Sequence, residues 1–310
     1  HLMYQRPKLL LFFIICLAHF SVSAQSLREK TLIKHMVYLS SDELKGRKTG
    51  TPENLKAREY IVSEFEKSGL NSQYPDYLQE FQFYNRREGK TLTGKNVVGF
   101  VAGTESKKII VITAHYDHVG VGKKNAEGDS IYNGADDNAS GTAALIEMAD
   151  YFAKNPAKHS LMFAALDGEE MGLQGAKALV ADFPFELEVI ALNVNMDMIS
   201  RNEKGELYVS GTHYHPQFKP ALESAAADSD IQLMFGHDIP GTGADDWTKS
   251  SDHGAFFEKK VPHLYFGVED HQDYHQVTDE FKNIDPEFYV KASRLILNCI
   301  LALDEDLAKE

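Results

Sequence analysis

Alternation of short strands with helices most restricts the fold of this chain. The segments 95–103 and 107–117 are short, rich in β-branched residues and bounded by turn formers, which is typical of strands. Further strands are predicted at 159–167, 186–197 and 261–267, and helices at 51–69, 139–154, 173–182, 216–229 and 285–307. This order predicts an α/β fold, a three-layer sandwich in which helices flank a mixed, largely parallel central sheet.

Residues 25–310 are expected to form a single domain. No internal repeat and no low-complexity linker interrupts the alternation after the first 24 residues. A chain of 310 residues with 43% hydrophobic and 25% charged residues can bury a sizeable core. After residue 24 the sequence contains one cysteine, Cys299, so no internal disulfide is expected, and its apolar surroundings predict a buried thiol.

The first 24 residues have the pattern of a signal peptide. Arg6 and Lys8 precede an apolar run over 9–18, and the small residues Val22 and Ala24 suit a cleavage site before Gln25. The apolar run is shorter than the ~20 residues that a spanning helix needs, which disfavours the alternative of an uncleaved anchor. We therefore expect a secreted or periplasmic protein with no stable membrane insertion after cleavage.

The charge balance argues against a nucleic-acid partner. The formal net charge is −14, and no cluster of basic residues provides the electrostatic footprint that such partners need.

Acidic residues and a histidine stand at the ends of three predicted strands. His115 and Asp117 end one strand, Glu169 and Glu170 follow the next, and Asp197 ends a third. Because the carboxyl ends of parallel strands meet at one edge of a sheet, these side chains are expected to lie together.

The stretch "NGADDNASG" adds Asp136 and Asp137 to this acidic edge. Buried carboxylates without partners cost several kcal/mol, so the cluster predicts bound cations. Imidazole and carboxylate donors without cysteine suit Zn²⁺ or a related divalent ion in a catalytic site. A carboxylate can also bridge two such ions.

Five motifs, in order and spacing, resemble the di-zinc aminopeptidases of the M28 peptidase family: "AHYDHVG", "NGADDNASG", "LDGEEMGLQGA", "NVNMDMI" and "SSDHGAFF…DYHQVTD". The resemblance runs from "ELKGRKTGTPENLKAREYI" to the last helix. It implies that residues 25–310 are one peptidase domain with two Zn²⁺ or other divalent ions. It further implies hydrolysis of N-terminal amino acids from peptides with free N-termini.

The resemblance also implies a set of metal ligands. His115 and Asp197 correspond to ligands of one metal ion, and Glu170 and His275 to ligands of the other. Asp136 is interpreted as the bridge between them. Since the peptide after the bridging residue is cis in the family, a cis bond is expected between Asp136 and Asp137.

Three further residues are predicted to serve the reaction. Glu169 corresponds to the family's general base, which takes a proton from a metal-bridging water and passes it to the leaving amine. Asp117 lies two residues after His115, on the same side of an extended chain, and is expected to orient it. Tyr274 matches a tyrosine that stabilises the tetrahedral intermediate in some members.

Two other functions remain open from the sequence. One is a glutaminyl cyclase, which uses a single zinc for acyl transfer, and the other is a non-catalytic, receptor-like ectodomain. The roles of His118 and His253 are also open. Six other histidines in polar stretches are predicted to be solvated, namely His35, His159, His213, His215, His237 and His271.

Overall fold

The computed structural model describes residues 26–309, so the predicted signal peptide lies outside the described residues. The helices are α1 (Glu29–Leu39), α2 (Pro52–Ser68), α3 (Gly141–Lys154), α4 (Gln174–Ala181), α5 (Lys219–Ala226), α6 (His253–Glu258) and α7 (Pro286–Leu307). Within 26–309, none of them is both long and apolar enough to cross a membrane.

The strands are β1 (Asn71–Ser72), β2 (Leu78–Asn85), β3 (Lys90–Val101), β4 (Ser106–His115), β5 (Gly120–Val121), β6 (Ile131–Tyr132), β7 (His159–Leu166), β8 (Ile190–Met196), β9 (Glu206–Ser210), β10 (Gln232–Phe235) and β11 (His263–Gly267). All except β5 and β6, which pair with each other, belong to one sheet.

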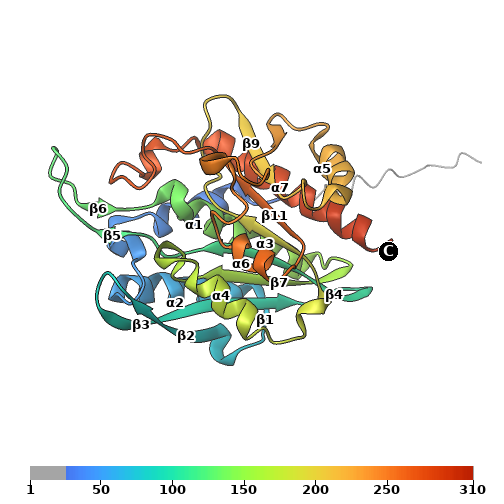
Figure 1. Ribbon diagram of the computed structural model, residues 1–310, viewed down its shortest axis with the longest axis horizontal. Coiled ribbons are helices and arrows are strands. Elements are labelled where there is room, and N and C mark those ends of the chain that lie inside the picture. Colours follow the sequence, from blue (N-terminus) through green and yellow to red (C-terminus); the bar gives the residue numbers. More distant parts are fainter. Residues whose placement is uncertain (1–25, 310) are drawn as a thin grey trace, which may run out of the picture.

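A mixed sheet forms the centre of the molecule, as predicted (Figure 1). Its order is β1-β3-β7-β4-β8-β11-β9-β10, and β2 also pairs with β3. The four central strands β7, β4, β8 and β11 are parallel to their neighbours in this group, whereas β3 and β9 join it antiparallel. The carboxyl ends of the four central strands therefore share one edge.

Helices cover both faces of the sheet, which confirms the three-layer architecture (Figure 1). The side chains of β4 alternate between the two layers: Ile110 and Ile112 pack in the larger core with α1, α2, α3 and α7, while Ile109 and Val111 pack in the smaller core with α4 and α6. This two-sided burial explains why β4 has a continuous apolar sequence.

The predicted helix ends are also present. The Thr51 hydroxyl accepts a hydrogen bond from the backbone N–H of Asn54 at 3.2 Å, and Gly69 ends α2 with a φ of 75°. The Asp285 carboxylate caps α7 by accepting from the N–H groups of Glu287 and Phe288. The strands β2, β9 and β10 were not predicted; β9 and β10 have only five and four residues, too short for a clear periodic pattern.

Candidate metal centre

The acidic side chains gather at the carboxyl edge of the sheet. His115 is the last residue of β4, and Asp197 directly follows β8. Glu169 and Glu170 lie in a short turn of helix after β7, and Asp137 lies in the irregular turn that precedes α3. The prediction that these strand ends bring their acids together is confirmed.

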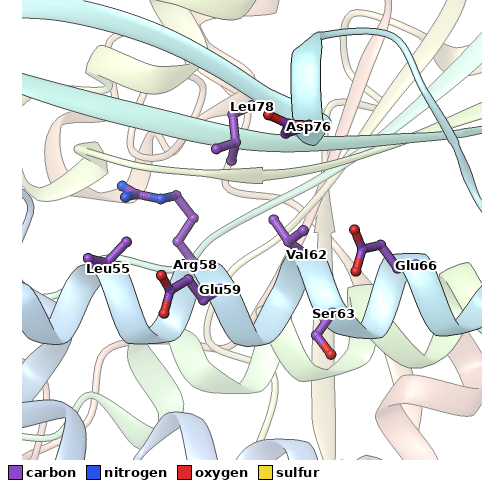
Figure 2. Close-up of a pocket in the computed structure, with 8 residues that line it drawn as sticks. All are labelled: Leu55, Arg58, Glu59, Val62, Ser63, Glu66, Asp76 and Leu78. Atoms are coloured by element: carbon purple, nitrogen blue, oxygen red, sulfur yellow. The ribbon is translucent and has the colours of Figure 1, made fainter.

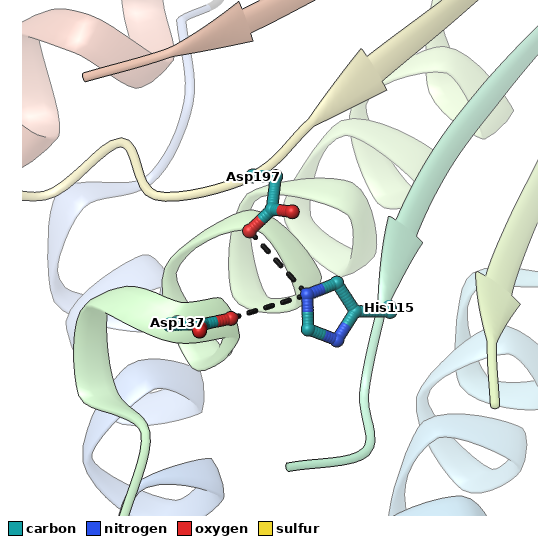
Figure 3. A group of neighbouring side chains, drawn as sticks. All are labelled: His115, Asp137 and Asp197. Atoms are coloured by element: carbon teal, nitrogen blue, oxygen red, sulfur yellow. Dashed lines mark ion pairs between the residues drawn. The ribbon is translucent and has the colours of Figure 1, made fainter. Parts of the chain in front are cut away.

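One group of three side chains is centred on His115. Its Nε2 atom is 3.2 Å from Asp137 Oδ1 and 3.3 Å from Asp197 Oδ1, and all three residues are buried (Figure 3). Even so, His115 Nε2 and Asp197 Oδ1 have no aligned hydrogen-bond partner within residues 26–309. Their donor atoms lie close enough to share one metal ion.

A second group lies on the other side of the Asp137 carboxylate. His275 Nε2 is 3.0 Å from Asp137 Oδ2 and 3.2 Å from Glu170 Oε2. His118 Nδ1 is 2.7 Å from Glu170 Oε1, and the three residues whose donor atoms lie close enough to share an ion are His118, Asp137 and Glu170. His275 contacts both carboxylates but does not belong to that set of three. Each oxygen of Asp137 therefore faces one group, which puts this carboxylate in the bridging position.

The assignment of Asp136 as the bridge is wrong. Its Oδ1 accepts hydrogen bonds from the N–H of Ser200 at 2.7 Å and from the Ser200 hydroxyl at 2.6 Å, and its Oδ2 is 2.9 Å from His271 Nε2. These contacts direct the Asp136 carboxylate away from both groups. The expected cis bond is likewise one residue off, since it joins Asp137 and Asn138.

The position of the acid pair is fixed by Asp279, the last residue of the motif "DYHQVTD". Its carboxylate accepts the backbone N–H of Asp136 at 2.8 Å and that of Asp137 at 3.0 Å. Burial, reinforced by the charge of Asp136, raises the pKa of Asp279 to about 6. No role was predicted for this residue from the sequence.

Arg47 connects the two segments that carry the candidate ligands. Its guanidinium is fully buried and donates to the backbone carbonyls of Tyr116 at 2.8 Å, Asn133 at 2.7 Å and Gly134 at 3.1 Å, and also to that of Leu39. Burial lowers the pKa of Arg47 to about 10. Arg47 thus adds a positive charge beneath an acidic site while it holds the loop after β4 against the turn before α3.

Asp117 positions its neighbours in a different way from that predicted. Its backbone carbonyl is 3.1 Å from His115 Nδ1, whereas its carboxylate is 3.5 Å from the same atom. The carboxylate instead accepts the N–H groups of Glu169 at 3.0 Å and Glu170 at 3.3 Å. Asp117 therefore orients His115 and also fixes the turn that carries both glutamates.

Glu169 lies beside the first group without belonging to it. Burial, together with the carboxylates of Asp197 and Asp252, raises the pKa of Glu169 well above its usual value, although His115 opposes the shift. Tyr274 stacks on the ring of His275 with centroids 4.0 Å apart. Both residues are thus close to the candidate ligands.

Several histidines lie elsewhere than predicted. His35 and His159 are buried, His237 stacks on Trp247 with its side chain only 10% exposed, and His271 contacts Asp136, so the prediction of solvated side chains is wrong for these four. His253 is also buried, but its Nε2 is 2.8 Å from the carbonyl of Trp247 and it joins neither metal-binding group. Its contacts stabilise the loop before α6.

A pocket of about 210 Å³ between α2 and β2 has a different character (Figure 2). Its lining residues are Leu55, Arg58, Glu59, Val62, Ser63, Glu66, Asp76 and Leu78. None of them belongs to either metal-binding group, and Figure 2 shows that the acids project from separate points rather than toward one another.

The donor set at the carboxyl edge fits zinc. It consists of imidazole nitrogens and carboxylate oxygens, and buried atoms without hydrogen-bond partners among the described residues occur in both groups. Buried polar atoms are normally paired, so unpaired ones at converging ligand positions are explained by a cation.

Comparison with known proteins agrees with this site. Aminopeptidase YwaD of Bacillus subtilis (strain 168) is 28% identical over 220 residues, covering 66% of this chain and 43% of that protein. The chain spans about half the length of the curated relatives it matches.

Solved structures share the fold. An aminopeptidase from Aneurinibacillus sp. strain AM-1 superimposes with a TM-score of 0.72 at 17% identity, covering 89% of this chain and 93% of that one. A glutaminyl cyclase from Bacteroides thetaiotaomicron gives a TM-score of 0.72 at 16% identity, covering 89% and 98%. These likenesses show the architecture alone. The model of peptidase family M28 matches residues 96–300, which include every candidate ligand, and the chain therefore belongs to peptidase family M28.

Proposed function

We propose that this protein is a zinc-dependent aminopeptidase that removes N-terminal amino acids from peptides. The observation that carries the proposal is the position of Asp137, which presents one carboxylate oxygen to each of two groups of candidate ligands. His115 and Asp197 would complete one zinc site, and Glu170 and His275 the other. Two bound Zn²⁺ ions would supply Lewis acidity and lower the pKa of a bound water.

Glu169 is the proposed general base. A general base works best when its pKa lies near the working pH, and the raised pKa of Glu169 is a shift in that direction. It would accept a proton from the attacking water and donate it to the leaving amine. The N–H contacts from Glu169 and Glu170 to Asp117 hold both side chains in place while they perform different tasks.

Tyr274 is proposed to stabilise the oxyanion of the tetrahedral intermediate. Its ring lies against His275, and burial raises the pKa of its hydroxyl, which keeps that hydroxyl protonated as a donor. The names of two similar proteins, an aminopeptidase of Bacillus subtilis and one of Aneurinibacillus, support the choice of a free N-terminus as the substrate feature.

Mass spectrometry of peptide mixtures tests the function. The protein would be incubated with zinc and unblocked peptides, one of which begins with glutamine, beside N-acetylated copies of each. Stepwise shortening of only the unblocked peptides is the expected result. Loss of ammonia from the glutamine peptide without shortening would identify a cyclase, and no change in any peptide would favour a non-catalytic ectodomain.

We further propose that residues 1–24 direct export, so that the mature protein is secreted or periplasmic. Expression of the full chain in a bacterial host followed by N-terminal sequencing checks this. A mature N-terminus at Gln25 in the exported fraction is expected, whereas an intact N-terminus in the cytoplasm would contradict it.

A further inference from the structure

We propose that His118 is an additional protein ligand of the second metal ion, beside Asp137, Glu170 and His275. This inference rests on the proposed function only in assuming that zinc binds at both groups. It assigns a role to His118, for which the sequence alone predicted none.

The contact between His118 and Glu170 resembles the contacts of the first group. His118 Nδ1 is 2.7 Å from Glu170 Oε1, yet both atoms have no aligned hydrogen-bond partner within residues 26–309. His115 Nε2 and Asp197 Oδ1 show the same combination of a short distance and an unsatisfied atom. In both groups a nitrogen and a carboxylate oxygen converge as donors around a shared cation would.

Packing directs the His118 ring toward this point. The side chain is fully buried, and its ring centroid is 5.8 Å from that of His275. On another side lies Gly134, where an added Cβ would come within 2.5 Å of the His118 ring and within 2.2 Å of the Asp137 carbonyl oxygen. Glycine at position 134, with a φ of 57°, therefore leaves the space that His118 occupies.

An additional ligand makes the two sites chemically different. The first would have three protein donors, from His115, Asp137 and Asp197, and so would keep an open position, as catalytic zinc sites do. The second would have four, from His118, Asp137, Glu170 and His275, which is the donor count of closed sites. We therefore expect the second ion to bind more tightly and the first to exchange more readily.

Metal affinity tests this assignment without relying on activity. Zinc would be titrated into the metal-free protein against a competing chelator, for the wild type and for His118→Gln. The matched control is His159→Gln, which alters another buried histidine beside a carboxylate, at the opposite end of the sheet. We expect His118→Gln to weaken one of two ions by more than ~100-fold, because loss of an outer hydrogen-bond partner costs only about 10–100-fold. The control should bind both ions as the wild type does.

X-ray absorption of the wild type loaded with two equivalents of zinc provides a test that needs no variant. Three imidazoles shared by the two ions are expected, from His115, His118 and His275; two imidazoles, one for each ion, would overturn the inference. A loss of less than ~100-fold in His118→Gln would also overturn it, and would leave His118 as an outer partner of Glu170. Wild-type protein that binds no zinc would instead contradict the proposed function itself.

Discussion

Buried histidine and carboxylate side chains meet at both ends of the central strands. Their hydrogen-bonding atoms have partners at the amino end of β7, but in the described part of the chain not all of them have partners at the carboxyl end of β4. At the amino end of β7, Asp304 accepts hydrogen bonds from the N–H groups of Lys158 and His159 and is 2.8 Å from His159 Nδ1. At the carboxyl end of β4, His115 Nε2 has no aligned partner among residues 26–309. Residue type is the same at both ends, so the difference lies in pairing and convergence. Among residues 26–309, the unpaired histidine and carboxylate atoms at the carboxyl end lie close enough to share an ion.

Among the substitutions at the carboxyl edge of the sheet, Glu169→Gln should cause the largest loss of turnover. Removing a general base typically lowers turnover by about 10²–10⁴-fold, and the amide keeps the size of the side chain. We expect this loss in kcat for an unblocked peptide, with zinc content and thermal midpoint unchanged. Glu66→Gln, at an exposed position of α2, is the control. A Glu169→Gln protein with more than a tenth of wild-type turnover would exclude the general-base role.

The two adjacent aspartates should differ sharply in metal binding. Asp137→Asn removes the carboxylate that faces both groups, so we expect both zinc affinities to fall by more than ~100-fold, beyond what an outer partner contributes. Asp136→Asn should lower them by less than about tenfold, because its partners are Ser200 and His271. Competition titration with a chelator measures both, and the reverse order of effects would restore Asp136 as the bridge.

A substitution at the amino end of β7 should lower the stability of the fold without changing turnover or zinc binding. Asp304→Ala removes the acceptor for two backbone N–H groups and for a buried histidine, and loss of one partner of a buried pair costs about 3–5 kcal/mol. We expect this decrease in the free energy of unfolding by denaturant titration, with unchanged turnover per folded molecule. Asp306→Ala, whose ion pair with Lys309 is exposed, should cost less than about 1 kcal/mol. A loss of zinc in Asp304→Ala would remove the distinction between the two ends.

Much of this site is predictable because strand ends are predictable. His115 ends one buried apolar strand, and Glu170 and Asp197 follow two others, so their meeting at one edge follows from the parallel sheet. The choice between Asp136 and Asp137 depends on side-chain direction in an irregular turn, and neighbouring aspartates have the same residue type.

Arg47 and His118 illustrate a second kind of limit. The partners of Arg47 are backbone carbonyls, which any sequence provides, so no acidic residue marks its position. His118 reaches Glu170 only because the chain turns after β4 and because Gly134 leaves room for its ring. Contacts of these kinds become visible only when the turns are placed in space.

The smallest predicted effect concerns His35 in α1, a buried histidine in neither metal-binding group. Its Nδ1 is 2.6 Å from the Tyr60 hydroxyl, its Nε2 is 3.9 Å from Glu147, and burial lowers its pKa to about 4. Because the pKa is lower in the folded state than in the unfolded state, protonation favours unfolding, and stability should fall as the pH decreases from 6.5 to 4.

By this linkage His35 should account for about 2 kcal/mol of the stability lost between pH 7 and pH 5. Unfolding free energies of His35→Gln should therefore vary less over this range than those of the wild type, by that amount. His213→Gln, at an exposed position, is the control and should follow the wild-type profile. Parallel profiles for His35→Gln and the wild type would mean that His35 is not held neutral by the fold. A reduced slope would show that this buried histidine contributes to stability as a neutral side chain, without any metal.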